Sequence, residues 1–182
     1  MLGGTALAVS ALLSGCGIQR AWVPSCRNGD ALILILQSVP SATFTPCIKA
    51  LPTGWTFGGE SIKSGHSEFW LDSDRAGPQA VTVTLTRACD VAGAVQVPTE
   101  PDEIGLQRYE EPQALPPHFS GNRYYLFPGG CVTYRFRFQP GTPFLVANDA
   151  TGALTFLARE AAVRALAKEG LTLCGAGARC PG

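Results

Sequence analysis

The 182-residue sequence predicts a small α+β domain, a disulfide-stapled antiparallel β-sheet of about five or six strands with one C-terminal helix packed on it. Three observations support this prediction. Apolar and polar residues alternate in 79–87 and 131–138, as in strands that bury one face. Residues 154–170 are rich in the helix formers Ala and Leu. Once the cysteine of the N-terminal leader is set aside, an even number of cysteines is left, which suits disulfide pairing.

The first half of the chain is expected to consist mainly of strands and turns. ALILILQ, residues 31–37, is a continuous apolar run whose isoleucines and flanking turn residues favour a buried strand, with a short helix as the alternative. TFTPCIK, residues 43–49, predicts a shorter strand, which Pro46 confines to an edge. A turn-rich stretch at 51–59 precedes the strand predicted for HSEFWL, residues 66–71.

The middle of the chain combines the clearest strand with a long acidic segment. In QAVTVTLTR, residues 79–87, the aliphatic side chains point one way and the threonines the other. AVQVP, residues 94–98, predicts a short edge strand. The Pro-rich segment 98–117 sets five carboxylates against one arginine, Arg108, and is expected to be a surface loop.

A hairpin and a helix complete the predicted domain. NRYYLF at 122–127 and CVTYRFRF at 131–138 flank a Pro-Gly-Gly turn whose glycines can adopt positive φ. In 154–170, the i,i+4 pair of Glu160 and Arg164 supports a helix that packs its apolar side chains on the sheet.

The apolar leader ends in a motif with a specific chemical meaning. Residues 2–15 carry no charge and are too short to span a bilayer of about 30 Å. Leu13-Ser14-Gly15-Cys16 resembles the lipobox of bacterial lipoproteins. The resemblance implies that a diacylglyceryl group is attached to the Cys16 thiol and that the leader is cut before it. An ordinary signal peptide, or a buried N-terminal helix with a chance cysteine, is the alternative.

This resemblance predicts the domain organisation of the chain and its cellular location. Residues 1–15 are a signal peptide, 16–30 are the lipidated cysteine and a tether, and 31–182 form a single extracytoplasmic globular domain. The protein is then lipid-anchored in the cell membrane on its extracytoplasmic side, since two or more acyl chains anchor stably. The positive charge that usually opens such a leader is missing, so we expect the true start to lie upstream.

The other six cysteines are expected to form disulfides, because an exported protein folds in an oxidising compartment. Six cysteines allow fifteen connectivities. We prefer the pairs Cys174–Cys180, which are close in sequence, and Cys89–Cys131, which each lie at a strand end, with Cys26 and Cys47 left by elimination. Metal ligation is disfavoured, because there is no C-x-x-C pair and neither histidine lies near a cysteine.

The equal numbers of positive and negative residues limit the classes of partner that the protein is expected to bind. Lys plus Arg and Asp plus Glu each total 14, and charged residues are 15% of the chain against about 25% in ordinary soluble domains. No basic field is present to hold a polyanion, so we expect no nucleic-acid partner.

Candidate site residues are few. Arg135 and Arg137 are two residues apart and can reach one anion, and Trp55 and Trp70 can line an apolar groove. We expect no catalytic residue, metal or cofactor. Gly65-His66-Ser67 begins like a nucleophile elbow, but Phe69 replaces the closing glycine and the context is a strand.

Together these features predict a non-catalytic binding or interaction module of the cell envelope, whose partner is an envelope protein, a peptide or the cell wall. Two alternatives stay open, a secreted-type hydrolase that uses His66 and Ser67 and a carrier of a hydrophobic ligand between sheet and helix. A hydrolase needs a histidine within hydrogen-bond reach of its nucleophile, and a carrier needs an apolar cavity.

The lipobox generates the first testable prediction. Replacing Cys16→Ala removes the thiol that would carry the lipid, so the protein should leave the detergent phase in a Triton X-114 partition. Mass spectrometry of the mature N-terminus should find an acylated cysteine in the wild type. An unmodified N-terminus elsewhere in the wild-type chain would contradict the lipoprotein interpretation.

Overall fold

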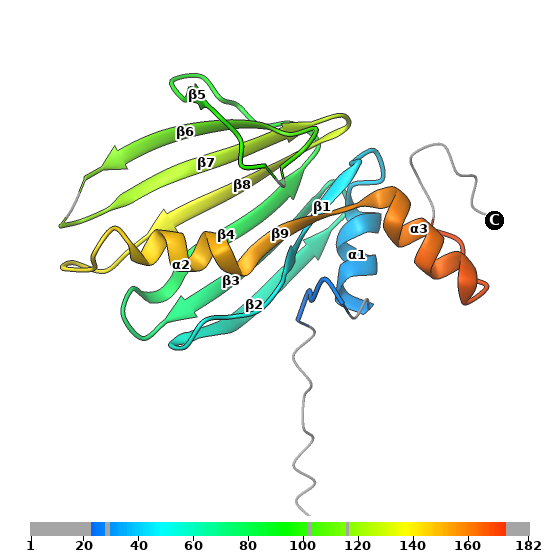
Figure 1. Cartoon of the computed structure of the whole chain (residues 1–182), viewed down its shortest axis with the longest axis horizontal. Coiled ribbons are helices and arrows are strands. Elements are labelled where there is room, and N and C mark those ends of the chain that lie inside the picture. The colour runs from blue at the N-terminus through cyan, green and yellow to red at the C-terminus, as the bar shows by residue number, and fades with distance from the viewer. Residues whose placement is uncertain (1–22, 28–29, 102, 116, 174–182) are drawn as a thin grey trace, which may run out of the picture.

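The computed structural model describes residues 23–27, 30–101, 103–115 and 117–173, and it confirms the α+β class (Figure 1). Two antiparallel sheets combine with three helices, one of them C-terminal. No helix in these ranges is long and apolar enough to cross a membrane. The elements are, in chain order, α1 Asp30–Ser38, β1 Phe44–Ile48, β2 Trp55–Lys63, β3 His66–Ser73, β4 Gly77–Thr86, β5 Val95–Val97, β6 Gln107–Ala114, β7 Ser120–Phe127, β8 Gly130–Arg137, α2 Val146–Ala153, β9 Leu154–Ala158 and α3 Arg159–Lys168.

The main sheet has seven strands in the order β2-β3-β4-β8-β7-β6-β5, and every neighbouring pair is antiparallel. The strands expected from alternation, β3, β4 and the β7–β8 hairpin, form its centre, and the short β5 is an edge strand as predicted. We call the face that carries Phe69, Val83, Tyr125 and Tyr134 the inner face, because these side chains are buried in the core. The opposite, outer face carries the threonines of β4.

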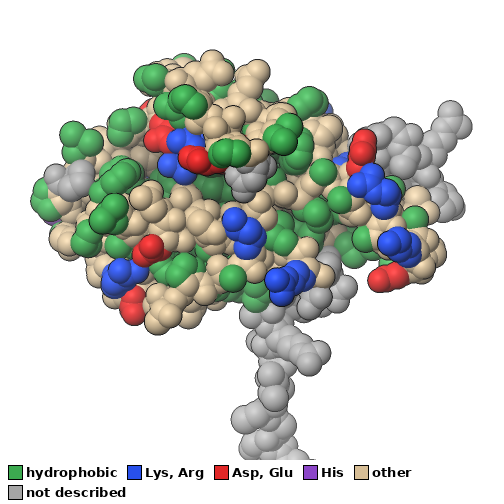
Figure 2. Space-filling view, viewed as in Figure 1, with side chains coloured by type: hydrophobic (Ala, Val, Ile, Leu, Met, Phe, Trp, Pro, Cys, Tyr) green, Lys and Arg blue, Asp and Glu red, His purple; other side chains and the backbone are tan. Residues whose placement is uncertain are grey.

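The inner face is covered by a second layer made of α2 and the two-stranded β1–β9 sheet (Figure 1). Val146, Ala147 and Ala150 of α2 are buried in the same cluster as the inner-face side chains. Burial of apolar surface, worth about 25 cal/mol per Å², holds the two layers together. In the space-filling view, acidic and basic side chains gather beside the loop that enters β6, at the lower left and over α3, with mostly uncharged surface between them (Figure 2).

The turn between β7 and β8 fixes where β1 begins. Gly129 has φ +75°, and a Cβ there would collide with the backbone of Ser41, so glycine is required. The Ser41 hydroxyl donates to the Gly129 carbonyl at 2.6 Å, and the Thr43 backbone N–H donates to the Pro128 carbonyl at 3.2 Å. The predicted hairpin turn thus also anchors the covering layer.

The expectation of a strand at 31–37 was wrong, since this run forms α1. Its buried positions are spaced as on one helical stripe, whereas Leu34 and Gln37 are exposed. A short apolar run does not distinguish a buried strand from a buried helix by period alone. Tertiary packing decides the outcome, because α1 buries Ile35 in the main core and packs Leu36 in a second cluster that also includes Leu166 of α3.

The expectation of one helix over 154–170 was also wrong. Its first five residues form β9, which pairs with β1 in the register Leu154↔Ile48 to Ala158↔Phe44. The β-branched and aromatic residues of this stretch suit a strand once a partner is present. The helix proper, α3, begins at Arg159 and lies beyond the end of the sheet beside α1, not on the sheet (Figure 1).

Three further elements differ from the sequence prediction. The acidic segment 98–117 is not all loop, because β6 forms within it and pairs with β7. The turn-rich stretch at 51–59 starts the long strand β2, and α2 was not anticipated. In each case pairing or packing with another element supplies the stability that local composition lacks.

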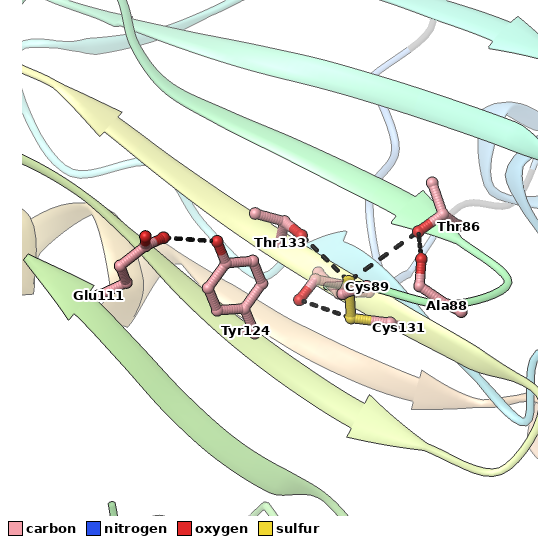
Figure 3. Close-up of a disulfide and its surroundings, with 8 residues drawn as sticks. Thr86, Ala88, Cys89, Glu111, Tyr124, Cys131 and Thr133 are labelled. Atoms are coloured by element: carbon pink, nitrogen blue, oxygen red, sulfur yellow. Dashed lines mark hydrogen bonds between the residues drawn. A yellow bond between two sulfur atoms is a disulfide. The ribbon is translucent and has the colours of Figure 1, made fainter. Parts of the chain in front are cut away.

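Two disulfides join the preferred cysteine pairs. Cys26–Cys47 ties the segment before α1 to β1, and Cys89–Cys131 holds the loop after β4 on the outer face (Figure 3). The Thr133 hydroxyl lies 3.2 Å from the Cys89 sulfur. Cys16, Cys174 and Cys180 lie outside the described residues.

The second prediction concerns Cys89–Cys131, which closes a loop with a sequence separation of 42. The double variant Cys89→Ser/Cys131→Ser should lose about 2–4 kcal/mol of unfolding free energy, because the crosslink restricts the unfolded chain. Urea unfolding of both proteins, with Thr56→Ser as a matched exposed control, measures the difference. A loss below about 0.5 kcal/mol, the size of an ordinary surface change, would contradict the expectation.

Candidate functional site: a charged pocket on the inner face

A pocket of about 450 Å³ opens on the inner face where the covering layer leaves β6 and β7 exposed. Strands β6, β7 and β8 form one wall, and α2 and β9 form the other. The lining residues come from both layers and from the loop before β6. They are Lys49, Glu100, Glu103, Arg108, Arg123, Tyr125, Tyr134, Asn148, Thr151, Gly152, Leu154, Thr155 and Phe156.

A carboxylate shared by two guanidinium groups forms the floor of the charged cluster. Alternation along β6 places Arg108 and Glu110 on the inner face, and β7 adds Arg123 beside them. Glu110 Oε1 lies 3.3 Å from Arg108 Nη2 and 2.9 Å from Arg123 Nη2. The arginine side chains are only 14% and 16% exposed, so water screens these pairs weakly.

Two more carboxylates reach this cluster from the loop before β6. Glu100 Oε1 lies 3.3 Å and Glu103 Oε2 3.8 Å from Arg108 Nη1. Glu103 Oε2 also accepts the backbone N–H of Glu100 at 2.8 Å, which fixes the loop. Three carboxylates therefore face two guanidinium groups, and the cluster, defined by Glu100, Glu103, Arg108, Glu110 and Arg123, carries one negative charge in excess.

Aromatic rings line the pocket next to the charged cluster. The ring centroid of Tyr125 lies 4.7 Å from that of Phe156 and 5.2 Å from that of Tyr134, both edge-to-face. Tyr134 and Phe156 stack in parallel planes at 6.2 Å. These contacts bring residues of β7, β8 and β9 together and close the pocket on its core side.

Burial and neighbouring charges determine the ionisation of the cluster. Burial raises the pKa of Tyr125 far above its usual range, and Glu103 adds to this against the opposing effect of Arg123. For Arg123 burial lowers the pKa, but Tyr125, Glu110 and Glu103 outweigh it and the net shift is upward. At neutral pH the tyrosine is therefore a neutral hydroxyl and the arginine is fully charged.

Lys49 adds a separate cation at the mouth of the pocket. Its backbone N–H donates to the Ala153 carbonyl at 2.8 Å, which places it where β1 meets the end of α2. The side chain is exposed, and its ammonium group forms no ion pair within the described part of the chain. The pocket thus combines this cation with the carboxylates of the charged cluster.

These groups can form ion pairs, hydrogen bonds and aromatic contacts with a ligand. The pocket presents charged donors, charged acceptors and aromatic faces, and its tyrosine hydroxyls are held neutral. In the described ranges, no group of three or more His, Cys, Asp or Glu side chains is placed to hold a metal ion.

The binding residues predicted from the sequence do not come together. Arg135 and Arg137 are exposed on the outer face, on the far side of the sheet from the pocket. Trp55 is buried in the core at 4% exposure. Trp70 alternates with the buried Phe69 and lies against Gly59 on the outer face. These four residues therefore form no common site.

The candidate hydrolase residues are separated by strand alternation. Ser67 points to the inner face and is 2% exposed, and its hydroxyl has no hydrogen-bond partner among the described residues. His66 points to the outer face, where its Nε2 lies 3.6 Å from Glu68 Oε2. The two side chains form no serine–histidine dyad. Asp72 nearby accepts the backbone N–H of Gln79 at 2.7 Å and so stabilises a turn.

The sequence analysis missed most of the pocket. It recognised the acidic segment and its single arginine, but it did not connect them with Arg123, Tyr125 or Phe156. The alternation within QRYEEP, residues 107–112, was the available signal, since it places Arg108 and Glu110 on one face. The contribution of β9 could not be seen, because that segment runs without a turn signal into the Ala-rich helix that follows it.

The third prediction tests the shared carboxylate. Glu110→Gln keeps the shape of the side chain but leaves two mostly buried guanidinium groups without their common counter-charge. The unfolding free energy should therefore fall by about 1–2 kcal/mol, a value that is discounted for the partial exposure of Glu110. Glu160→Gln, in an exposed i,i+4 pair, is the matched control and should cost about 0.5 kcal/mol or less. Equal losses in chemical denaturation would show that the cluster is no better coupled than a surface pair.

Comparison with known proteins supplies no counterpart for this pocket. No protein-family model matches the chain, and no curated protein and no solved structure matches it either. The case for a function therefore rests on the side chains that line the pocket.

Proposed function

We propose that this protein is a lipid-anchored binding module of the cell envelope, and that the charged pocket on the inner face is its ligand site. The observation that carries the proposal is the cluster of two arginines and three glutamates, held at the one part of the inner face that the covering layer leaves open. Burying charges is costly unless they are paired, so a merely structural cluster would be expected to be closed over or replaced by apolar side chains.

The geometry favours binding over the two alternatives. A hydrolase built on Ser67 lacks support, because His66 lies on the opposite face of the strand. A carrier of a hydrophobic ligand requires an apolar cavity between sheet and helix. The pocket between the main sheet and α2 is lined by charged groups. A larger pocket of about 770 Å³ beside α3 has apolar residues in its lining, but Arg159, Glu160 and Arg164 line it as well. The anchor is supported by the lipobox-like Leu13-Ser14-Gly15-Cys16, and it would hold the pocket at the extracytoplasmic surface.

A steric block provides the fourth prediction. Thr155 of β9 lines the pocket, and Thr155→Trp should fill it without changing its charges. We expect full-length wild type, purified from envelopes in detergent, to retain an envelope-derived small molecule that mass spectrometry detects, and the blocked variant to lose it. Thr56→Trp, at an exposed position of β2, is the control and should retain it.

Two results would contradict the proposal. One is retention of the same component by the Thr155→Trp variant, which would place binding elsewhere. The other is the absence of any component specific to the wild type and its Thr56→Trp control.

A further inference from the structure

We infer that the pocket binds a small zwitterion, a ligand with one ammonium and one carboxylate group, such as a free amino acid or a short peptide with free ends. The inference rests on the proposed function and names the class of its ligand. It follows from the distribution of positive and negative charges around the pocket as a whole.

The first step is the charge balance of the pocket. The charged residues of the lining are counted together with Glu110, which is not itself a lining residue but pairs with both arginines. The cluster of two arginines and three glutamates carries one negative charge in excess, and Lys49 carries one positive charge. The sum is zero, so the pocket has no net attraction for a simple anion or a simple cation. Because the two charges are separated, it attracts a ligand whose own charges are separated in the opposite sense.

The second step is which groups are free to meet a ligand. Arg108 and Arg123 already share Glu110, and both are mostly buried. Glu100 is the most accessible carboxylate of the cluster, at 65% side-chain exposure. Its Oε1 faces Arg108, and its Oε2 forms no hydrogen bond or ion pair with the described residues. A carboxylate accepts up to about four hydrogen bonds, so Glu100 has capacity for an ammonium group.

The third step is the cationic end. Lys49 is exposed at the pocket mouth and, in the part of the chain that the structure describes, makes no ion pair. An ammonium group in this position pairs with a carboxylate as a point charge. The ligand's carboxylate is therefore assigned to Lys49, and its ammonium to Glu100 and the excess negative charge of the cluster.

The fourth step is the size and the remaining surface. A volume of about 450 Å³ lies within the range of small-molecule sites and suits a compact ligand. Phe156, partly exposed, and the edge-to-face ring of Tyr125 provide an apolar wall. A ligand side chain with an aromatic or aliphatic group can pack there, while its ends meet the two charged regions.

The fifth prediction uses one scaffold with each end blocked in turn. Isothermal titration of the full-length protein in detergent is carried out with phenylalanine and with alanyl-phenylalanine, each in four forms. These are the free zwitterion, the N-acetyl form, the C-terminal amide and the doubly blocked form. For at least one scaffold, we expect the zwitterion to bind at least tenfold more tightly than any blocked form. Which scaffold binds distinguishes an amino-acid ligand from a peptide.

Charge-removing variants assign the two ends. Lys49→Gln should abolish the preference for a free carboxylate over the amide, and Glu100→Gln should abolish the preference for a free ammonium over the N-acetyl form. Lys63→Gln, at the exposed end of β2, is the matched control and should leave both preferences unchanged. A preference that survives the Lys49 and Glu100 variants would overturn the assignment.

The outcomes separate this inference from the proposed function. Equal binding of blocked and free forms, or no binding of either scaffold, overturns the zwitterion inference. If the wild type nevertheless retains an envelope component that Thr155→Trp loses, the pocket is a binding site for another class of ligand. If no such component is retained, the proposed function fails as well.

Discussion

The apolar side chains on the inner face of the seven-stranded sheet must be shielded from water, and the layer that covers them is short. The β1–β9 pair and α2 cover the central strands, where the side chains are aliphatic and aromatic. They do not reach across β6, and there the inner-face positions are Arg108 and Glu110 instead of apolar residues. The chain thus changes from apolar to charged side chains along the inner face where the covering layer ends.

The charged end of this face is held by mutual pairing. Glu110 pairs with two guanidinium groups at once. The loop before β6 is held by Glu103, which accepts a backbone N–H and faces Arg108. Burial raises the pKa of Tyr125, and Glu103 adds to this effect while Arg123 opposes it, so the tyrosine stays protonated. Tyr125 therefore links the charged cluster to the covering layer, because its ring also packs edge-to-face on Phe156 of that layer. A ligand in the pocket would touch both layers and the loop.

The disulfides attach two segments outside the named strands to the two sheets. Cys26–Cys47 attaches the segment before α1 to β1, and the parallel bridge of Ser25 to Ile48 continues this attachment. If Cys16 carries the proposed lipid, the anchor lies ten positions before Cys26 in the sequence. A chain of this length spans at most about 35 Å when fully extended. The domain would then stay close to the membrane surface. Cys89–Cys131 fastens the long connection between β4 and β5 to the outer face (Figure 3).

By itself the sequence determined the strands in which one buried face imposes a period of two, namely β3, β4 and the β7–β8 hairpin, and with them the α+β class. It also indicated the two observed cysteine pairs. Tertiary structure alone decided the elements whose local signal is ambiguous. Residues 31–37 became a helix because α3 packs beside them, and 154–158 became a strand because β1 offers a partner. The pocket belongs to this second group, since Lys49, Glu100, Arg123 and Phe156 are far apart in the chain and meet only when the covering layer docks on the sheet.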